Sequence, residues 1–196
     1  ARIWGRNLKP IFMDLNSIID HTLLKPTATQ AEILKLCAEA KQYQFWSVCV
    51  NPVWVKLAKQ QGVRVCSVVG FPLGANTLAI KIAEIKQAIT DGADELDVVI
   101  NNIADLRRQT KTVVAAASGK IVKIIIETAY LTQSEKTLAA KLVKESGANF
   151  VKTSTGFGPS GATVEDVKLL CRAVGPDFGV KASGGIKTKT QALAMI

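Results

Sequence analysis

Histidine and cysteine are scarce in this chain of 196 residues, and their scarcity limits the chemistry available to it. The chain has one histidine, His21, and four cysteines, none of which form a Cys-x-x-Cys pair. A zinc cluster needs several such ligands at short spacing, so we expect no metal site. A catalytic triad would have to use His21, which stands in no motif that would supply its partners.

Long apolar runs are absent as well. No stretch reaches the length of a membrane-spanning helix, and the first six residues lack the apolar core of a signal peptide. The composition, 48% hydrophobic and 21% charged, is that of a folded globular protein, and the length suits a single core. We therefore expect a cytoplasmic protein without a membrane partner, whose thiols stay reduced.

Acidic residues are outnumbered, since 25 Lys and Arg stand against 16 Asp and Glu, and the net charge is +9. Such a charge suits an anionic partner. The basic residues are spread along the expected helices and are not clustered with aromatic residues, so a small phosphorylated substrate is a better interpretation than nucleic acid. A basic surface that is merely solvated would explain the charge equally well.

From Ile18 onward the chain repeats one cycle of apolar strand, polar turn and amphipathic helix. This alternation, without a hairpin signal, predicts an α/β protein with a parallel sheet, either a barrel or a doubly wound sheet. Residues 1–15 are expected to form a tail or a short helix, and residues 16–196 a single domain. The expected strands are Asp20–Leu24, Ser47–Val50, Val63–Gly70, Glu95–Asn101, Val122–Glu127, Phe150–Thr155 and Gly179–Ser183.

Local signals mark the ends of the helices. Four threonines, each followed three residues later by Glu, Asp or Gln, have the capping-box pattern of a helix start. They are Thr29, Thr132, Thr163 and Thr188. Glycines mark three expected helix ends, at Gly62, Gly92 and Gly147.

A weak internal repeat aligns Asp91–Asp97 with Ser146–Lys152. Asp97 and Lys152 therefore lie at the same offset from a helix-ending glycine. Equal offsets place both side chains on the same face of their strands, because strand side chains alternate with a period of two. If the sheet closes, that face is the interior of the barrel.

Charged residues interrupt the apolar strands at Asp20, Asp97, Lys123 with Glu127, Lys152 and Lys181. A buried cation is unfavourable unless it is paired or neutral, so Lys152 has two interpretations. In the first interpretation, Lys152 has a structural role, as a member of an ion pair or as a side chain that reaches solvent. In the second, it is a neutral amine that can form a Schiff base. In the second case Lys181 and burial would lower the pKa of Lys152, and Asp97 would accept and return protons. Lys123 and Glu127 are expected either to support the pocket or to pair with each other.

Glycine-rich turns follow both lysine-bearing strands, at Gly156–Gly158 and at Gly184–Gly185. Glycine lets backbone N–H groups approach a phosphate, so these turns favour an anion site, although most such pairs are only tight turns.

Taken together, the ordered motifs resemble the deoxyribose-phosphate aldolase family of class I aldolases, from about Ile18 to the end of the chain. The motifs are Ile19-Asp20-His21-Thr22-Leu23-Leu24-Lys25-Pro26, Ser47-Val48-Cys49-Val50-Asn51-Pro52, Val69-Gly70-Phe71-Pro72-Leu73-Gly74, Glu95-Leu96-Asp97-Val98-Val99-Ile100-Asn101, Ile126-Glu127-Thr128, Val151-Lys152-Thr153-Ser154-Thr155-Gly156 and Val180-Lys181-Ala182-Ser183-Gly184-Gly185-Ile186.

This resemblance implies a (β/α)8 TIM barrel that reversibly cleaves 2-deoxy-D-ribose 5-phosphate to D-glyceraldehyde 3-phosphate and acetaldehyde, without a cofactor. It implies that Lys152 is the Schiff-base lysine, that Lys181 tunes it and relays protons, and that Asp97 is the acidic partner. The residues implied to bind the substrate are Asp20, Cys49, Thr155, Gly156, Gly184 and Gly185. Because family members are often dimers or tetramers, we expect a homodimer or a homotetramer.

The chain departs from the family pattern in two respects. Only seven strands are expected, and the chain stops at Ile196, so we expect the eighth strand–helix unit to be missing from it. Phe157 and Ser160 stand where some members carry basic residues, which leaves Lys187 as the local cation for the phosphate. Two alternatives remain open, namely another Schiff-base aldolase of phosphorylated sugars and a non-catalytic barrel that binds a phosphate ligand.

Overall fold

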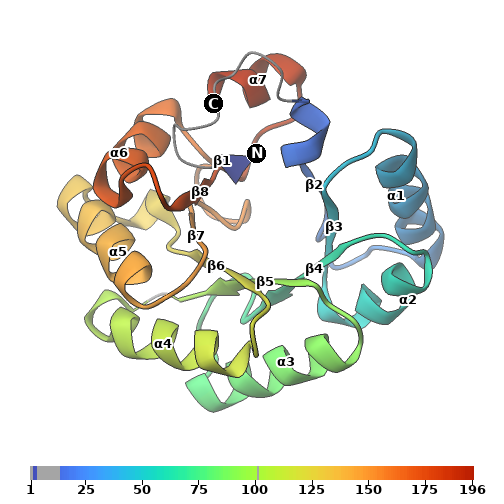
Figure 1. Cartoon of the computed structure of the whole chain (residues 1–196), viewed down its shortest axis with the longest axis horizontal. Helices are drawn as coiled ribbons and strands as arrows, with labels where there is room; N and C mark the ends of the chain where they lie inside the picture. The colour runs from blue at the N-terminus through green and yellow to red at the C-terminus, as the bar shows by residue number, and fades with distance from the viewer. Residues whose placement is uncertain (1, 4–13, 101) are drawn as a thin grey trace.

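The computed structural model describes residues 2–3, 14–100 and 102–196, in which strands and helices alternate (Figure 1). The strands are β1 (Arg2–Ile3), β2 (Asp20–Leu23), β3 (Ser47–Val50), β4 (Val65–Val69), β5 (Glu95–Val99), β6 (Ile121–Ile125), β7 (Phe150–Lys152) and β8 (Gly179–Lys181). The helices are α1 (Gln30–Gln42), α2 (Val55–Gln60), α3 (Leu78–Thr90), α4 (Leu106–Ala116), α5 (Gln133–Glu145), α6 (Val164–Val174) and α7 (Lys189–Ala194). Short 3-10 helices are η1 (Leu15–Ile18), η2 (Pro52–Trp54), η3 (Ile103–Asp105) and η4 (Thr128–Tyr130).

Seven parallel strands, β2 to β8, lie side by side in the order of the chain. Figure 1 shows them curled around a centre with the helices on the outside, so the predicted barrel-type α/β architecture is confirmed. The place beside β8 is taken by β1, which runs antiparallel to it. Among the described strands β1 and β2 are the two ends of the sheet, and no backbone pairing joins them.

The segment 1–15, for which the sequence predicts a tail or a short helix, is described only in part. Arg2 and Ile3 form β1 by pairing with Lys181 and Val180, and Leu15 begins the 3-10 helix η1. Residues 4–13 lie outside the described residues. A strand of two residues is too short to show the period-two pattern by which strands are recognised, which is why the sequence does not predict it.

The predicted helix boundaries are confirmed. Thr29, Thr132 and Thr188 each complete a reciprocal capping box, and Thr163 accepts a hydrogen bond from the backbone N–H of Asp166. Three glycines follow α2, α3 and α5 with φ of 72°, 102° and 85°, a conformation that glycine adopts without steric cost. They are Gly62, Gly92 and Gly147.

Strand β3 has the predicted bounds, whereas the other six parallel strands end earlier than the sequence predicts, most clearly β7 and β8, which stop at Lys152 and Lys181. Beyond these lysines, side-chain hydroxyl groups contribute to the bonding between the two segments. Thr153 Oγ1 accepts a hydrogen bond from Ser183 N at 3.1 Å, and Ser183 Oγ donates to the carbonyl of Ser154 at 2.5 Å. The strand-like sequence therefore extends beyond the last residues that form regular backbone hydrogen bonds between β7 and β8.

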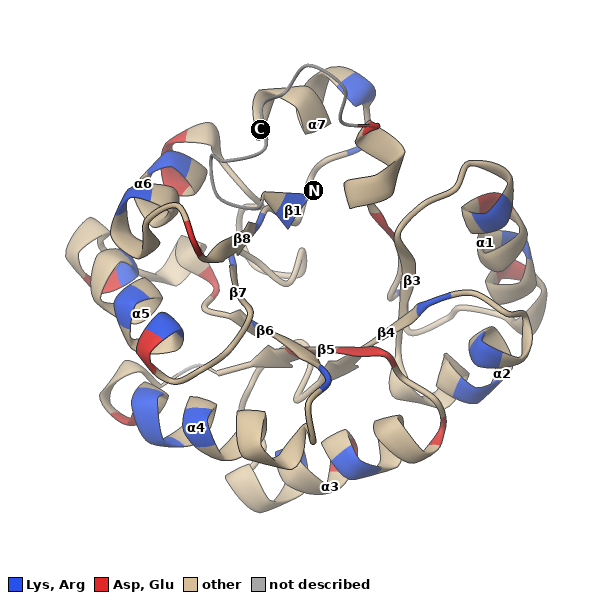
Figure 2. Cartoon of the chain, viewed as in Figure 1, with Lys and Arg blue, Asp and Glu red and all other residues tan. Residues whose placement is uncertain are grey.

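Side chains alternate along the buried strands. Leu96, Val98 and Val151 belong to the apolar core that the strands share with the surrounding helices. Asp97 lies between Leu96 and Val98, and Lys152 follows Val151, so both side chains face the interior of the ring, where they meet. Figure 2 shows charged segments on the inner strands as well as on the outer helices. No described helix is long and apolar enough to cross a membrane.

Candidate active site

A cavity of about 1250 Å³ opens at the carboxyl ends of the parallel strands. Segments that follow strands make its wall, for example 155–157 after β7 and 182–189 after β8. All ten site residues expected from the sequence line this cavity: Asp20, Cys49, Asp97, Lys152, Thr155, Gly156, Lys181, Gly184, Gly185 and Lys187. The wall also includes residues that the sequence analysis did not select, among them Ser183 and Lys189.

Lys152 reaches the cavity from the end of β7 and is 4% exposed. Its ammonium group lies 2.6 Å from Asp97 Oδ2, and the other oxygen of Asp97 lies 2.6 Å from the ammonium group of the fully buried Lys123. The internal repeat predicts that Asp97 and Lys152 share a face, and this contact confirms it.

Lys181 is the register partner of Lys152 on the neighbouring strand β8. Its ammonium group donates to Asp20 Oδ2, while Asp20 Oδ1 accepts from Arg2 Nε at 2.9 Å and from Ser47 Oγ at 2.8 Å. Asp20 belongs to β2, so the ion pair with Lys181 connects two strands that lie near opposite ends of the sheet order. Charged side chains thus bridge the interior where β1 and β2 are not paired.

Glu95 extends the buried cluster behind Asp97. It lies 2.7 Å from the ammonium group of Lys123, accepts from Trp46 Nε1 at 2.7 Å, and pairs with the guanidinium of Arg2. Arg2 is also held between aromatic rings, with its guanidinium carbon 4.9 Å from the Trp46 centroid and 5.5 Å from that of Phe150. Such stacking on ring faces favours a cation in a desolvated site.

Two members of this cluster, Glu95 and Arg2, were not predicted from the sequence. Glu95 lies two residues before Asp97, so the period-two rule would have placed it on the same face. Arg2 carried no such signal, because nothing in its short segment indicates a strand.

The expectation that Lys123 and Glu127 either pair or support the pocket is corrected in part. Lys123 pairs with Asp97 and Glu95 instead, whereas Glu127 accepts hydrogen bonds from the backbone N–H of Thr155 at 3.1 Å and from its hydroxyl. The two charged residues therefore serve different parts of the site. Lys123 joins the ion cluster, and Glu127 holds the segment that follows β7.

The carboxyl groups of the cluster stay ionised. Burial alone would raise the pKa of Asp97, but the ammonium groups of Lys123 and Lys152 outweigh it and hold that pKa well below its usual value. The same balance lowers the pKa of Asp20, where Lys181 and Lys123 outweigh the cost of burial. Both side chains are therefore anions that face ammonium groups.

The pKa values of Lys152 and Lys181 are shifted in opposite directions. Burial lowers the pKa of Lys152, but the Asp97 carboxylate together with Cys49 and Cys66 outweighs burial, so the pKa lies above its ordinary value. Burial, with the repulsion of Lys123 and Lys152, keeps the pKa of Lys181 below its ordinary value despite the attraction of Asp20. The prediction that Lys181 depresses the pKa of Lys152 is therefore wrong for this arrangement, because Asp97 lies directly on the Lys152 ammonium group.

Comparison with known proteins shows which family the chain belongs to. The profile of the DeoC/LacD family of aldolases matches residues 15–196. The deoxyribose-phosphate aldolase of Clostridium botulinum (strain Langeland) is 55% identical over 195 residues, which cover 94% of this chain and 92% of the relative. The chain belongs to the DeoC/LacD family of aldolases. The deoxyribose-phosphate aldolase of Thermococcus gammatolerans is also 55% identical, over 94% of this chain and 88% of the relative.

Solved structures of aldolases superpose closely on this DeoC/LacD family member. The aldolase QR15 has a TM-score of 0.89 at 37% identity, over 94% of this chain and 87% of its own. A tetrameric deoxyribose-phosphate aldolase from Aeropyrum pernix has a TM-score of 0.87 at 36% identity, over 92% of this chain and 82% of its own.

In this DeoC/LacD aldolase the rim of the cavity is built where two loops touch through their backbones. A Cβ atom placed on Gly161 would lie 2.3 Å from the carbonyl oxygen of Gly184, and one on Gly184 would lie 2.9 Å from the Cα of Gly161. Only glycine fits both positions. Gly156, Gly184 and Gly185 also adopt positive φ, and the exposed Lys187 lies beside them in the cavity wall.

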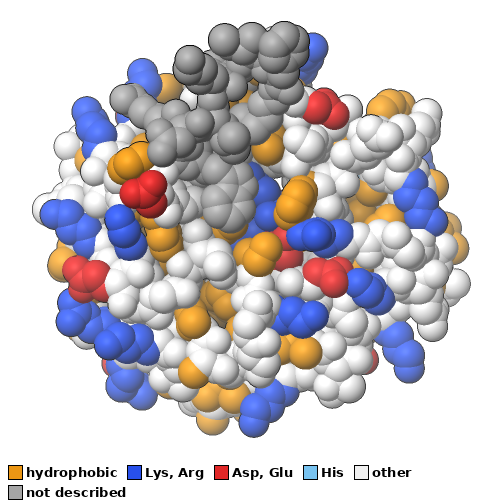
Figure 3. Space-filling view, in the orientation of Figure 1, with side chains coloured by type: hydrophobic (Ala, Val, Ile, Leu, Met, Phe, Trp, Pro, Cys, Tyr) orange, Lys and Arg blue, Asp and Glu red, His pale blue; other side chains and the backbone are white. Residues whose placement is uncertain are grey.

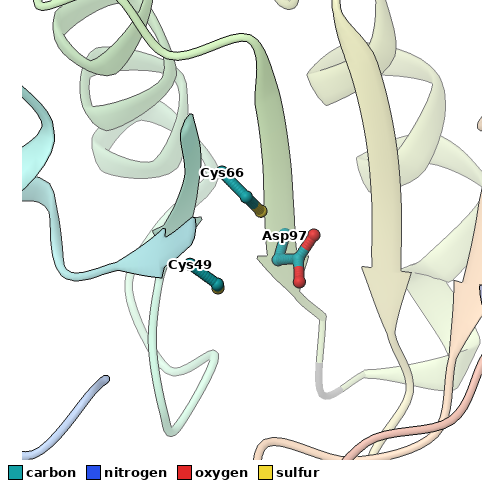
Figure 4. Close-up of side chains that lie close together, drawn as sticks. All are labelled: Cys49, Cys66 and Asp97. Carbon is teal, nitrogen blue, oxygen red and sulfur yellow. The ribbon is translucent and has the colours of Figure 1, made fainter. Parts of the chain in front are cut away.

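Two thiols and a carboxylate of this family member lie together beside Lys152. The Sγ atoms of Cys49 and Cys66 and a carboxylate oxygen of Asp97 are all within 4.8 Å of one another (Figure 4). Thiolates and carboxylates are ligands for metals. A metal ion here would have to displace two ammonium groups, because Lys123 and Lys152 already bind both oxygens of Asp97. The expected lack of a metal stays a prediction.

Proposed function

We propose that this DeoC/LacD aldolase reversibly cleaves 2-deoxy-D-ribose 5-phosphate to D-glyceraldehyde 3-phosphate and acetaldehyde through a Schiff base on Lys152. The observation that carries the proposal is the Lys152–Asp97 pair in the wall of a large cavity. The names of the relatives, which are 55% identical across most of their length, support the substrate.

Imine formation requires Lys152 to lose a proton before its nitrogen attacks the C1 aldehyde. Asp97 is a weak acceptor in the resting site because its pKa is low, whereas Lys181 has a lowered pKa and gives up its own proton more readily than an ordinary lysine. We therefore assign to Lys181 the role of taking the proton of Lys152. The proton held by Lys181 then passes through Asp97 to the carbinolamine oxygen, which leaves as water.

The products determine which carbon–carbon bond is cleaved. Acetaldehyde contains C1 and C2 of the sugar, so the bond between C2 and C3 breaks as the C3 hydroxyl gives its proton to the relay of Asp97 and Lys181, which later returns it to C2. The electron pair of that bond moves into the protonated imine and gives an enamine on Lys152. Protonation at C2 and hydrolysis then release acetaldehyde and restore the amine. In this scheme Asp20 lies near a sugar hydroxyl and Cys49 lines the pocket beside the imine.

The phosphate is assigned to the rim made by Thr155, Gly156, Gly184, Gly185 and Lys187. The glycines there leave backbone N–H groups accessible, and Lys187 supplies a positive charge. Figure 3 supports a small anion over nucleic acid, because Lys and Arg side chains are dispersed over this face with acidic ones between them. This location agrees with the general position of active sites at the carboxyl ends of barrel strands.

Two further assignments accompany the proposal. We propose that the protein forms a homodimer or a homotetramer, which the tetrameric aldolase from Aeropyrum pernix supports by analogy. We also propose a cytoplasmic location, as expected for an enzyme of phosphorylated metabolites.

The test is a comparison of substrates. The protein is incubated with 2-deoxy-D-ribose 5-phosphate, ribose 5-phosphate and fructose 1,6-bisphosphate, and the released aldehydes are identified by mass spectrometry. We expect acetaldehyde and D-glyceraldehyde 3-phosphate from the deoxy sugar, with Lys152→Met as the inactive control. Cleavage of another sugar phosphate alone would contradict the substrate assignment, and binding of deoxyribose 5-phosphate without turnover would indicate a binding barrel.

A further inference from the structure

Cys49 and Cys66 form a pair of neighbouring thiols that the aldolase chemistry does not require as a pair. They are register partners on the adjacent parallel strands β3 and β4, and both are buried. Figure 4 shows both side chains on the face of the sheet that carries Asp97, and their Sγ atoms lie within 4.8 Å of each other. Neighbouring strands are about 4.8 Å apart, which falls within the Cα separation of about 4.4–6.8 Å that disulfides span.

The two thiols differ in access. Cys49 is 1% exposed and lies in the wall of the large cavity, so it is the thiol next to any small molecule that enters the cavity. Cys66 does not line that cavity and is completely buried, with the ammonium group of Lys123 3.3 Å from its sulfur. A small oxidant therefore meets Cys49 first, with Cys66 directly behind it.

The surroundings also separate the two thiols electrostatically. A hydrogen bond from Cys66 is the largest influence on Cys49 and lowers its pKa despite burial, with a further contribution from the charges of Lys152 and Lys123. Burial raises the pKa of the Cys66 thiol. A thiolate is the reactive form of cysteine, so Cys49 is the better nucleophile of the two.

We propose that Cys49 and Cys66 are a redox-active pair, in which a hydroperoxide oxidises Cys49 and Cys66 then resolves it to a reversible disulfide. In the first step the Cys49 thiolate attacks hydrogen peroxide: an S–O bond forms, the O–O bond breaks and hydroxide leaves. In the second step Cys66 attacks the sulfenic acid: the S–S bond forms, the S–O bond breaks and the second oxygen leaves as water. Two thiols and one peroxide thus give one disulfide and two waters.

The disulfide changes the active site without unfolding the barrel. It draws the sulfur of Cys49 toward β4 and away from the wall beside Lys152 and Asp97, in an interior too closely packed to absorb the shift. It also removes the thiol of Cys66 from the ammonium group of Lys123. The disulfide is reduced by thiol exchange at Cys49, the sulfur nearer the cavity. Aldolase activity is therefore lost on oxidation and regained on reduction.

The experiment combines peptide mapping with activity. The protein is treated with hydrogen peroxide, remaining thiols are alkylated, and peptides are mapped by mass spectrometry before and after dithiothreitol. We expect a Cys49–Cys66 linked peptide together with loss of aldolase activity, both reversed by dithiothreitol. The Cys37→Ala variant should behave in the same way, because Cys37 is buried in α1 and away from the cavity.

The Cys66→Ala variant separates a resolving thiol from a merely buried one. Without Cys66, peroxide should carry Cys49 on to sulfinic acid, and dithiothreitol should no longer restore activity relative to the untreated variant. Cys66→Ser serves the same purpose if the alanine variant does not fold. The proposal is overturned if peroxide-treated wild type shows both thiols alkylated, or if the Cys66 variants recover with dithiothreitol as fully as wild type. The linked peptide is read without any substrate, so this test does not depend on the proposed aldol reaction.

Discussion

Lys152 and Lys181 are register partners on neighbouring strands, and each holds the carboxylate of one aspartate. Their exposures are almost equal, at 4% and 5%, so burial does not distinguish them. Yet the pKa of Lys152 is raised and that of Lys181 is lowered. The difference comes from the wider cluster and from how each aspartate is shared.

Asp97 binds two ammonium groups, one on each oxygen. Asp20 pairs with Lys181 and also with the guanidinium of Arg2, and it lies 3.8 Å from Lys123. Among the described residues, four buried cations face three buried carboxylates, so one positive charge is in excess: Arg2, Lys123, Lys152 and Lys181 against Asp20, Glu95 and Asp97. A cluster with one excess cation favours the release of one proton, and Lys181 is the lysine that releases it most readily.

The largest effect is expected when the nucleophile is removed. Lys152→Met has no amine to form an imine, so kcat for cleavage of deoxyribose 5-phosphate should fall by more than about 10⁴-fold. Lys136→Met is the matched control, because Lys136 lies 2.6 Å from Asp166, as Lys152 does from Asp97, but does not line the cavity. Activity of Lys152→Met within about ten-fold of wild type would exclude Lys152 as the nucleophile.

Removal of the shared carboxylate should cause the largest loss of stability. Asp97→Asn leaves two buried ammonium groups without their counter-charge, and breaking a buried pair in this way costs about 3–5 kcal/mol. Urea unfolding measures the loss, and Asp166→Asn, at the partly exposed pair, should cost about 1 kcal/mol or less. Equal losses in the free energy of unfolding for Asp97→Asn and Asp166→Asn would contradict the claim that the buried ion cluster stabilises the fold more than the partly exposed pair does.

Acidification should reduce the difference in stability between wild type and Asp97→Asn. Because the pKa of Asp97 is lower in the folded state, its stabilising contribution is fully present above the pKa of the unfolded chain, about 3.9, and is lost as the pH falls below it. The stability gap between wild type and Asp97→Asn should therefore narrow below about pH 4. A gap that stays constant between neutral and acidic pH would show that the ionised form of Asp97 is not responsible.

Substitution of Lys181 should reduce activity less than substitution of Lys152, and it should also change the dependence of the rate on pH. Removal of a proton acceptor costs about 10²–10⁴-fold, so both Lys181→Met and Lys181→Arg should be slow. In wild type the rate of imine formation should rise with pH as Lys181 deprotonates, at a pH lower than for an ordinary lysine. Lys181→Arg stays charged and should lose that dependence, which stopped-flow measurement across pH would detect. The same pH dependence in Lys181→Arg would exclude Lys181 as the acceptor.

The smallest effect is expected at Arg2. Arg2→Met removes the excess positive charge and frees Asp20 for Lys181, so the pKa of Lys181 should rise. Activity at neutral pH should fall by less than about ten-fold, with the pH dependence of imine formation shifted upward. Arg2→Lys, which retains the charge, should restore much of the wild-type profile. A shift of this pH dependence to lower pH in Arg2→Met would contradict the inference that one excess positive charge lowers the pKa of Lys181.

Much of the fold follows from patterns that repeat along the chain. The seven parallel strands and the capped helix starts at Thr29 and Thr132 follow from apolar periodicity and local hydrogen bonding. The strand ends did not follow. Thr153 and Ser154 look like strand residues, but the Thr153 hydroxyl donates to the Ser183 carbonyl and the Ser154 backbone N–H donates to the Ser183 hydroxyl. Strand β1 did not follow either, because its partner β8 lies far away in the sequence.

The site was predictable where a residue has a motif, and unpredictable where its role depends on contacts across the barrel. Asp97 and Lys152 share an offset in a repeat, so their meeting could be anticipated. The partner of Lys123 could not, because neighbours in sequence such as Glu127 compete with Glu95, which is distant in sequence and near in space. The direction of the Lys152 pKa shift depends on the 2.6 Å contact with Asp97 and on the nearby Cys49 and Cys66, which a sequence does not specify.

The central claim is that Lys152, and not its neighbour Lys181, forms the imine. The most direct measurement is incubation of the protein with acetaldehyde, reduction with borohydride, and location of the adduct by peptide mass spectrometry. We expect an adduct on Lys152 that is lost in Lys152→Ala and weakened in Lys181→Leu. An adduct on Lys181, or none in the folded protein, would contradict it.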